Sequence, residues 1–211
     1  MVSIAIPTGA LNGGALNLLN RSGLAHLTAD DLGRRLLAEN GDVRVILVRP
    51  ADVPAYVDHG AADLGIVGKD ILWESPGSHY ELVDLNFGPC SLVFAVPQDG
   101  TLFGPETWPP LLRVATKYPR TASAWFESLG QAVEVVRLHG SVELAPQVGL
   151  VDGIVDLTAT GRTLRENRLR VAAILDTSSA RLIANQASMK TRTAAVQAMV
   201  AKLREAAGID R

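Results

Sequence analysis

The chain contains the stretch Gly153-Ile-Val-Asp156-Leu-Thr158-Ala-Thr160-Gly161-Arg162-Thr163-Leu164. Its apolar, β-branched beginning predicts a buried strand over residues 153–157. The hydroxyl- and glycine-containing loop that follows, and the Arg-Thr-Leu run after it, predict a turn into a helix. A buried strand that passes through a short loop into a helix is the repeating unit of α/β proteins, so this stretch indicates the fold class.

Short β-branched runs and amphipathic stretches alternate along the rest of the chain. The expected strands cover residues 2–6, 43–48, 63–67, 91–96, 113–116, 133–138, 153–157, 171–175 and 181–184. Helical spacing predicts helices between Gly9 and Gly23, from Asp52 to Gly60, over 119–129 and 141–148, and near the C-terminus. The alternation predicts an α/β protein with largely parallel sheets.

One internal similarity bears on the number of lobes. The run Gly60-Ala-Ala-Asp63-Leu-Gly-Ile-Val67 resembles Gly149-Leu-Val-Asp152-Gly-Ile-Val155 if a one-residue gap is allowed. Either all strand–helix units look alike, or the chain forms two similarly built lobes with a cleft between them. Under the second interpretation, lobe I covers residues 1–90 plus 178–211, and lobe II covers residues 91–177.

Composition narrows the possible functions. The 211 residues include 20 Lys+Arg and 22 Asp+Glu, and the net charge of −2 argues against a broad nucleic-acid surface. Cys90 is the single cysteine, which excludes an intrachain disulfide and a CxxC zinc site, and the four histidines have no chelating spacing. We therefore expect no metal site, and the lack of a targeting signal or a spanning apolar run predicts a cytoplasmic protein without membrane contact.

The loop after residue 157 has two interpretations. Backbone N–H groups at a helix N-terminus and threonine hydroxyls together form an anion cradle, and a carboxylate at Asp156 suits the hydroxyls of a ribose. Alternatively, the segment is a threonine-capped turn in which Asp156 caps the helix, and for the loop alone this explanation is sufficient.

Two neighbouring turns favour the binding interpretation. Residues 139–146 form a strand-to-helix turn in which we expect Ser141 to cap a helix and Glu143 to stand in its first turn. Residues 113–119 end a strand with Lys117 just before another helix. In a parallel sheet these turns lie at the carboxyl edge, where open α/β folds bind ligands.

With these motifs together, the sequence resembles the ATP phosphoribosyltransferase family, which catalyses the first step of histidine biosynthesis. The resemblance covers nearly the whole chain in the right order, including the run Gly140-Ser-Val-Glu-Leu-Ala-Pro146. The other matching segments are residues 43–57, 60–70, 113–119, 156–164 and 178–183.

The resemblance implies a fold, a reaction and a set of site residues. The fold is that of type II periplasmic binding proteins, and the reaction joins N1 of ATP to phosphoribosyl pyrophosphate (PRPP), with Mg²⁺ carried by the substrate phosphates. Asp156 and Glu143 would hold the ribose, Arg49 would assist the leaving group, and a loop would bind PRPP through Thr158, Ala159, Thr160, Gly161, Arg162 and Thr163. Contacts to ATP or pyrophosphate would come from Thr8, Gly9, Arg34, Arg49 and Lys117.

The resemblance also implies an assembly and reveals one departure. The chain resembles the short catalytic form, which is expected as a homodimer within a hetero-oligomer whose regulatory subunit resembles histidyl-tRNA synthetase. The first turn of the family normally reads Pro/Ser-Lys-Gly-Arg-Leu, whereas here it reads Pro7-Thr-Gly-Ala-Leu11, without the two cations. Two alternatives to the enzyme therefore stay open: a two-lobed small-molecule binding protein, and a weakly active family member that depends on its partner.

Overall fold

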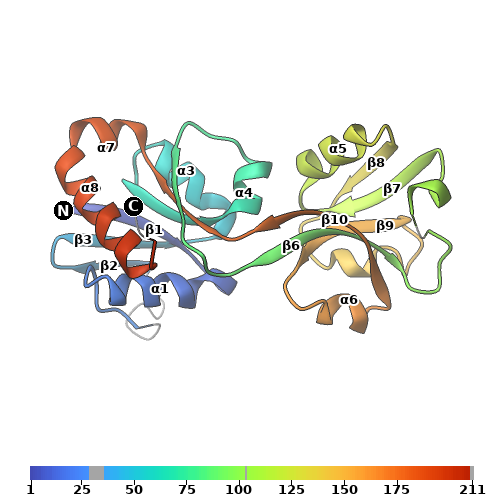
Figure 1. Cartoon of the computed structure of the whole chain (residues 1–211), viewed down its shortest axis with the longest axis horizontal. Helices are drawn as coiled ribbons and strands as arrows, with labels where there is room; N and C mark the ends of the chain where they lie inside the picture. Colours follow the sequence, from blue (N-terminus) through green and yellow to red (C-terminus); the bar gives the residue numbers. More distant parts are fainter. Residues whose placement is uncertain (29–35, 103, 210–211) are drawn as a thin grey trace. The chain divides into compact units, whose positions relative to one another are not determined.

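The computed structural model describes residues 1–28, 36–102 and 104–209. The chain divides into two compact units, and both combine helices with a β-sheet, which confirms the predicted α/β class (Figure 1). The first unit consists of Met1–Gly88 and Ser179–Arg211, and the second consists of Pro89–Ser178. The chain passes from one unit to the other after Gly88 and again after Ser178, and the predicted lobe boundaries, after residues 90 and 177, lie close to these two points.

The first unit is built on a six-stranded sheet with the order β2-β3-β1-β4-β11-β5. Its centre, β3-β1-β4, is parallel, and β2, β11 and β5 are antiparallel to their neighbours. The strands are β1 (Val2–Pro7), β2 (Leu37–Asn40), β3 (Val43–Val48), β4 (Leu64–Gly68), β5 (Tyr80–Asp84) and β11 (Ala180–Ala184). The α-helices are α1 (Asn12–Arg21), α3 (Val53–Asp58), α4 (Lys69–Glu74), α7 (Gln186–Thr191) and α8 (Thr193–Ala206).

The second unit is built on a five-stranded sheet with the order β10-β6-β9-β7-β8. Here β9-β7-β8 is parallel, and β6 and β10 are antiparallel. The strands are β6 (Cys90–Pro97), β7 (Leu111–Thr116), β8 (Ala132–Arg137), β9 (Gly153–Thr158) and β10 (Leu169–Ser178), and the α-helices are α5 (Pro119–Ser128) and α6 (Arg162–Glu166).

The prediction of largely parallel sheets is wrong, because each sheet is mixed. A β-branched run shows that a strand is buried but contains no information on its direction. In each unit a parallel centre of three strands carries antiparallel neighbours, and its order places the first strand between the second and the third. The two runs that begin at Gly60 and Gly149 lead into β4 and β9, which are the third strands of the two parallel centres in chain order. The similarity in sequence therefore corresponds to equivalent positions in the two units.

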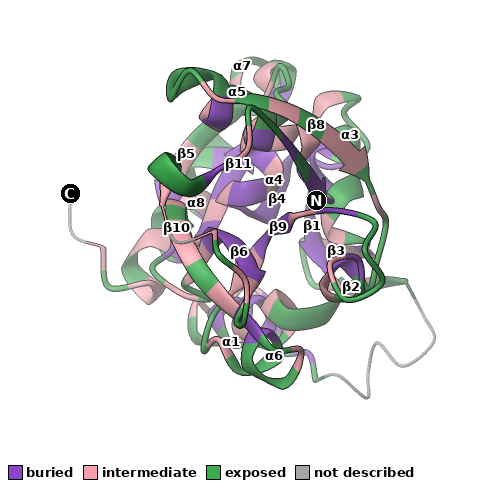
Figure 2. Cartoon of the chain, turned by 90° about the vertical axis from the view of Figure 1, so that its right-hand side faces the viewer, coloured by how far each residue is buried: buried purple, intermediate pink, exposed green. Residues whose placement is uncertain are grey.

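Apolar side chains on both faces of each sheet form the cores. In the first unit, α1 and α8 cover one face around Leu19 and Leu203, and α3 and α4 cover the other around Val57 and Leu72. In the second unit, α6 packs through Leu164, while an aromatic cluster of Phe94, Trp108, Trp125 and Phe126 joins α5 to the sheet. Figure 2 shows that burial is concentrated in central strands such as β1, β4 and β9.

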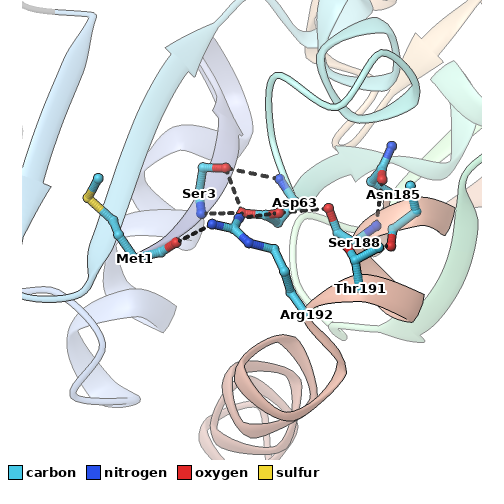
Figure 3. Close-up of polar contacts among 8 residues, drawn as sticks. Met1, Ser3, Asp63, Asn185, Ser188, Thr191 and Arg192 are labelled. Atoms are coloured by element: carbon cyan, nitrogen blue, oxygen red, sulfur yellow. Dashed lines mark hydrogen bonds and ion pairs between the residues drawn. The ribbon is translucent and has the colours of Figure 1, made fainter.

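A polar network ties the first unit together around Asp63 (Figure 3). The carboxylate accepts hydrogen bonds from the Ser3 N–H (2.8 Å), the Ser3 hydroxyl (2.8 Å) and the Ser188 hydroxyl (2.7 Å). Arg192 donates to both carboxylate oxygens, at 2.8 and 2.7 Å, and to the Met1 carbonyl at 3.0 Å. Burial raises the pKa of Asp63, but these hydrogen bonds outweigh it and leave the pKa below its ordinary value.

The predicted helix over residues 141–148 is wrong. Only a 3₁₀ turn, Val142–Leu144, forms there, and Ser141 adopts a left-handed conformation (φ 47°) without a side-chain capping bond. Pro146 explains the difference, because it has no N–H with which to continue helical hydrogen bonding. Asp52, where another helix was expected to begin, is the N-cap residue of α3, and its side chain makes no capping bond to that helix.

Candidate functional site

Asp156, in β9, is the buried carboxylate of the predicted site. Its side chain is 10% exposed, its Oδ1 accepts the Leu157 N–H at 2.9 Å, and its Oδ2 lies 3.7 Å from Lys117 Nζ. Burial raises the pKa of Asp156, the like charge of Glu143 adds to the rise, and Lys117 and the Leu157 N–H oppose it. The balance leaves the pKa above its ordinary value.

The hydroxyl loop that follows β9 is held by its own side chains. Thr158 Oγ1 accepts the Gly161 N–H at 2.9 Å, and Thr160 Oγ1 accepts the Arg162 N–H at 3.4 Å. Each hydroxyl therefore keeps its proton available for an anion. Gly161 has φ 70°, a left-handed conformation that favours glycine, and it starts α6, whose first N–H groups have no helical acceptor.

Two arginines of α6 have different roles in this loop. The Arg162 side chain is 79% exposed and its Nε donates to Glu166 Oε1 at 2.7 Å, so its guanidinium is paired along the helix surface. Arg165 was not predicted, yet its Nη1 donates to the Thr160 carbonyl at 3.1 Å. Arg165 thus fixes the loop through a hydrogen bond to its backbone. The spacing of one helical turn between Gly161 and Arg165 is the feature of the sequence from which this contact could have been predicted.

Glu143 and Asp156 share a pocket with the hydroxyl loop. The pocket, called here the hydroxyl-loop pocket, has a volume of about 190 Å³ and is lined by Glu143 and residues 156–164. Glu143 reaches it from the 3₁₀ turn rather than from the expected helix. Hydroxyl and N–H donors together with two carboxylate acceptors suit a ligand that carries both a phosphate and free hydroxyls.

A second pocket lies in the first unit, at the ends of β1 and β3. Its volume is about 460 Å³, and it brings together the predicted residues Thr8 and Arg49 with Asp52 and Tyr56, which were not predicted. The remaining lining residues are Leu36, Ile46, Leu47 and Val48. Helical spacing could have indicated Tyr56, because it follows Asp52 by one turn of α3.

The other predicted contacts to ATP or pyrophosphate lie elsewhere. Gly9 begins the 3₁₀ turn Gly9–Leu11 with φ 78°, directly after Thr8. Lys117 belongs to the second unit, where it pairs with Asp156. Arg34 lies outside the described residues. Within the described ranges, His, Cys, Asp and Glu side chains form no group of three suited to a metal ion, and no helix is long and apolar enough to span a membrane.

Comparison with known proteins gives the family. The sequence model described as HisG, ATP phosphoribosyltransferase, matches residues 49–205. The chain belongs to the ATP phosphoribosyltransferase family. ATP phosphoribosyltransferase of Rubrobacter xylanophilus is 48% identical over 202 residues, which cover 95% of this chain and 94% of that protein. The ATP phosphoribosyltransferase of Caldanaerobacter subterraneus is 45% identical over 207 residues, 97% of each chain.

Solved structures support both the family and the fold. One chain of the ATP phosphoribosyl transferase (HisG:HisZ) complex from Thermotoga maritima superposes with a TM-score of 0.84 at 34% identity, covering 100% of both chains. The periplasmic aliphatic sulphonate binding protein SsuA from Escherichia coli superposes with a TM-score of 0.62 at 14% identity, over 99% of this chain and 72% of that one. The second likeness shows the fold alone and confirms the type II periplasmic-binding-protein architecture.

These matches confirm the predicted activity as well as the family. The chain is a phosphoribosyltransferase, and its reaction is the first step of histidine biosynthesis. Its full-length match to a chain of the HisG:HisZ complex agrees with the prediction of a short-form catalytic subunit. Neither alternative, the two-lobed binding protein or the weakly active dependent member, is favoured.

Proposed function

We propose that this chain binds PRPP in the hydroxyl-loop pocket and transfers its 5-phosphoribosyl group to N1 of ATP. The carrying observation is the juxtaposition of Asp156 and Glu143 with the hydroxyl loop in one pocket. The bond from the anomeric carbon to pyrophosphate breaks and pyrophosphate leaves with the electron pair. The bond to N1 then forms, and the positive charge that develops on the ribose passes to the adenine ring.

The residues of the second unit orient the sugar in this proposal. The hydroxyls of Thr158 and Thr160 and the N–H groups in the first turn of α6 that have no helical acceptor hold the 5-phosphate, and Asp156 and Glu143 accept hydrogen bonds from the ribose hydroxyls. Because the reaction joins two bound substrates, most of the acceleration comes from alignment and from neutralising the leaving group, without a covalent nucleophile.

The pocket of the first unit would receive the other charged groups. Arg49, with Thr8 and Gly9, is proposed to contact the phosphates of ATP or the departing pyrophosphate. Mg²⁺ enters as part of the substrate. The described residues fit this role, because Mg²⁺ is usually bound through one or two carboxylates and substrate phosphates rather than in a protein cage, and only the Asp156 and Glu143 carboxylates line the hydroxyl-loop pocket.

The assembly is a further part of the proposal. We expect a homodimer that combines with a regulatory subunit related to histidyl-tRNA synthetase, and the likeness to a chain of the HisG:HisZ complex supports a hetero-oligomer. The reaction is placed in the cytoplasm, where ATP is abundant, and the single free cysteine is compatible with a reducing compartment.

The test is a steady-state assay of the purified chain with ATP, PRPP and Mg²⁺, with and without the regulatory subunit, followed by product absorbance. Thr160→Val combined with Gly161→Ala should raise KM for PRPP at least about tenfold, because a charged hydrogen bond and a left-handed glycine are both lost. An added Cβ at Gly161 also meets Arg165 Nη1 at 3.1 Å. KM for ATP should stay nearly unchanged.

Glu127→Gln serves as the control, because this exposed carboxylate lies on α5 and outside the pocket. It should leave both KM values near those of the wild type. Equal effects of the double substitution on the two substrates, at unchanged thermal stability, would show that the loop is not the phosphate site. Absence of product under every condition would contradict the proposed function.

A further inference from the structure

Lys117 and Asp156 form an ion pair across two neighbouring strands of the second unit. The parallel pairing of Thr116 in β7 with Val155 in β9 brings the next residues of both strands together at the sheet edge. Lys117 Nζ lies 3.7 Å from Asp156 Oδ2, and the side chains are 40% and 10% exposed respectively. The cation is therefore partly exposed to solvent, while the carboxylate is buried.

The charges that surround Asp156 make this cation important. Burial and the like charge of Glu143 both disfavour the ionised carboxylate, and Lys117 and the Leu157 N–H favour it. On the neighbouring strand β6, the residue paired with Asp156 is the apolar Val93. On α6, Arg162 is paired with Glu166, and Arg165 donates to the Thr160 carbonyl. Among the described residues, Lys117 is the cation whose charge acts on Asp156.

The ionised form of Asp156 is the form that best matches the hydroxyl donors of a ribose. An ionised carboxylate offers only acceptors, which match the hydroxyl donors of the sugar, whereas a protonated one presents a competing donor. A residue that keeps Asp156 ionised thereby controls the affinity for PRPP.

From this geometry we propose that Lys117 is a positioning residue of the ribose subsite, which keeps the Asp156 carboxylate charged and directed into the hydroxyl-loop pocket. This assignment rests on the proposed function and differs from the sequence-based expectation that Lys117 contacts ATP or pyrophosphate. Lys117 acts through Asp156 rather than on the leaving group.

The experiment measures PRPP binding to the full chain by calorimetry from pH 5 to pH 8.5. Lys117→Met should move the acidic limb of the binding curve to higher pH by about one unit, because an opposite charge at this distance has been removed. Lys117→Arg should restore the wild-type limb. Glu143→Gln should move the limb the other way, to lower pH, because it removes a like charge. Ionisation of the PRPP phosphates is common to all variants and cancels in the comparison.

Several outcomes overturn the inference. If Lys117→Met binds PRPP with the wild-type pH midpoint, or loses affinity uniformly at every pH, Lys117 does not act through the charge of Asp156. If the limb stays in place and only pyrophosphate binding weakens, Lys117 contacts the leaving group. If the wild type binds no PRPP, the proposed function itself fails. Thermal unfolding of each variant separates these results from misfolding.

Discussion

In each unit an aspartate next to a strand forms two hydrogen bonds with the backbone of one residue in a neighbouring strand. This pair of hydrogen bonds is called here the bracket, and the aspartates of the two brackets lie in different environments. In the first unit, the Asp63 N–H donates to the Ser3 carbonyl at 3.0 Å and Asp63 Oδ2 accepts the Ser3 N–H at 2.8 Å. In the second, the Asp152 N–H donates to the Arg113 carbonyl at 2.9 Å and Asp152 Oδ2 accepts the Arg113 N–H at 2.7 Å. Each bracket ties the start of one parallel strand to the neighbouring parallel strand, β4 to β1 in the first unit and β9 to β7 in the second.

The environments of the two brackets differ. The Asp63 side chain is 5% exposed and receives further hydrogen bonds from Ser188 and Arg192. The Asp152 side chain is 29% exposed, and its additional charged contact, to Arg113 Nη2, is 3.8 Å long. The first unit therefore places a buried carboxylate, with hydrogen bonds to both of its oxygens, at the amino end of β4. The second places its buried carboxylate, Asp156, near the carboxyl end of β9, where a substrate can reach it.

The largest effect is expected from substituting the two bracket aspartates. Asp63→Asn should lower the free energy of unfolding by about 3 kcal/mol, because it leaves Arg192 and the buried hydroxyls without their charged partner. Asp152→Asn should lower it by only about 1 kcal/mol, since water replaces much of what is lost. Urea unfolding followed by circular dichroism measures both. Equal losses would show that burial does not distinguish the two brackets.

The next largest effect is expected on catalysis, from changing the positive charges in the turns that follow β1 and β3. The first turn after β1 carries Thr8 and Ala10, so Arg49 after β3 carries more of the charge, and Arg49→Ala should lower kcat about ten- to a hundredfold. Ala10 is exposed, which leaves room for a longer side chain. Thr8→Lys with Ala10→Arg should raise kcat/KM and reduce the penalty of Arg49→Ala, as a double-mutant cycle can measure. No gain together with strict additivity would mean that the cations act independently or that other groups already supply the charge.

The smallest expected effect contrasts Asp63 with Asp156 as the pH changes. The pKa of Asp63 is lowered in the folded state, so ionised Asp63 stabilises the fold. This contribution to the free energy of unfolding is present above the ordinary carboxyl pKa and is lost as the pH falls through the pKa of the folded state. The pKa of Asp156 is raised in the folded state, so its effect on the free energy of unfolding has the opposite sign. Ionisation of Asp156 in the folded state lowers the stability once the pH exceeds the pKa of the unfolded state.

Asp156→Asn should therefore raise the free energy of unfolding at pH 7 while it abolishes PRPP binding. The gain should disappear near pH 3, where the wild-type side chain is also neutral. Denaturant unfolding at the two pH values provides the measurement. A loss of stability at pH 7 would show that the ion pair with Lys117 outweighs the cost of burial.

Most buried strands could be predicted because their β-branched runs are local signals. The strands β2 and β5 lie at the edges of the first sheet and contain Glu39 and Glu81, so their composition does not distinguish them from loops. The helix expected after Ser141 failed at Pro146, a residue whose effect was available in the sequence. The direction of the antiparallel strands depends on tertiary pairing and has no local signal.

The site shows the same division between local and distant information. Asp156 and the hydroxyl loop could be singled out because polar residues follow an apolar run, whereas Glu143 was assigned to the ribose through the family resemblance. The structure brings all of them to one pocket. The contact between Lys117 and Asp156 depends on the register of β7 against β9, which sequence periodicity does not fix. Arg165 and Tyr56 were missed because a charged or aromatic side chain on a helix usually serves its surface or core. Their spacing of one helical turn from Gly161 and Asp52 is a weak signal, and the structure shows the contacts that they make with the loop and the pocket.

The chain order of the two units has a consequence for synthesis on the ribosome. The second unit is one continuous segment, Pro89–Ser178, whereas the first unit is interrupted by it. Until β11 emerges, one side of β4 and one side of β5 lack their partner, and Asp63 lacks Arg192. The second unit can therefore fold first, and the first unit keeps open strand edges, a form prone to aggregation, until the last part of the chain is made.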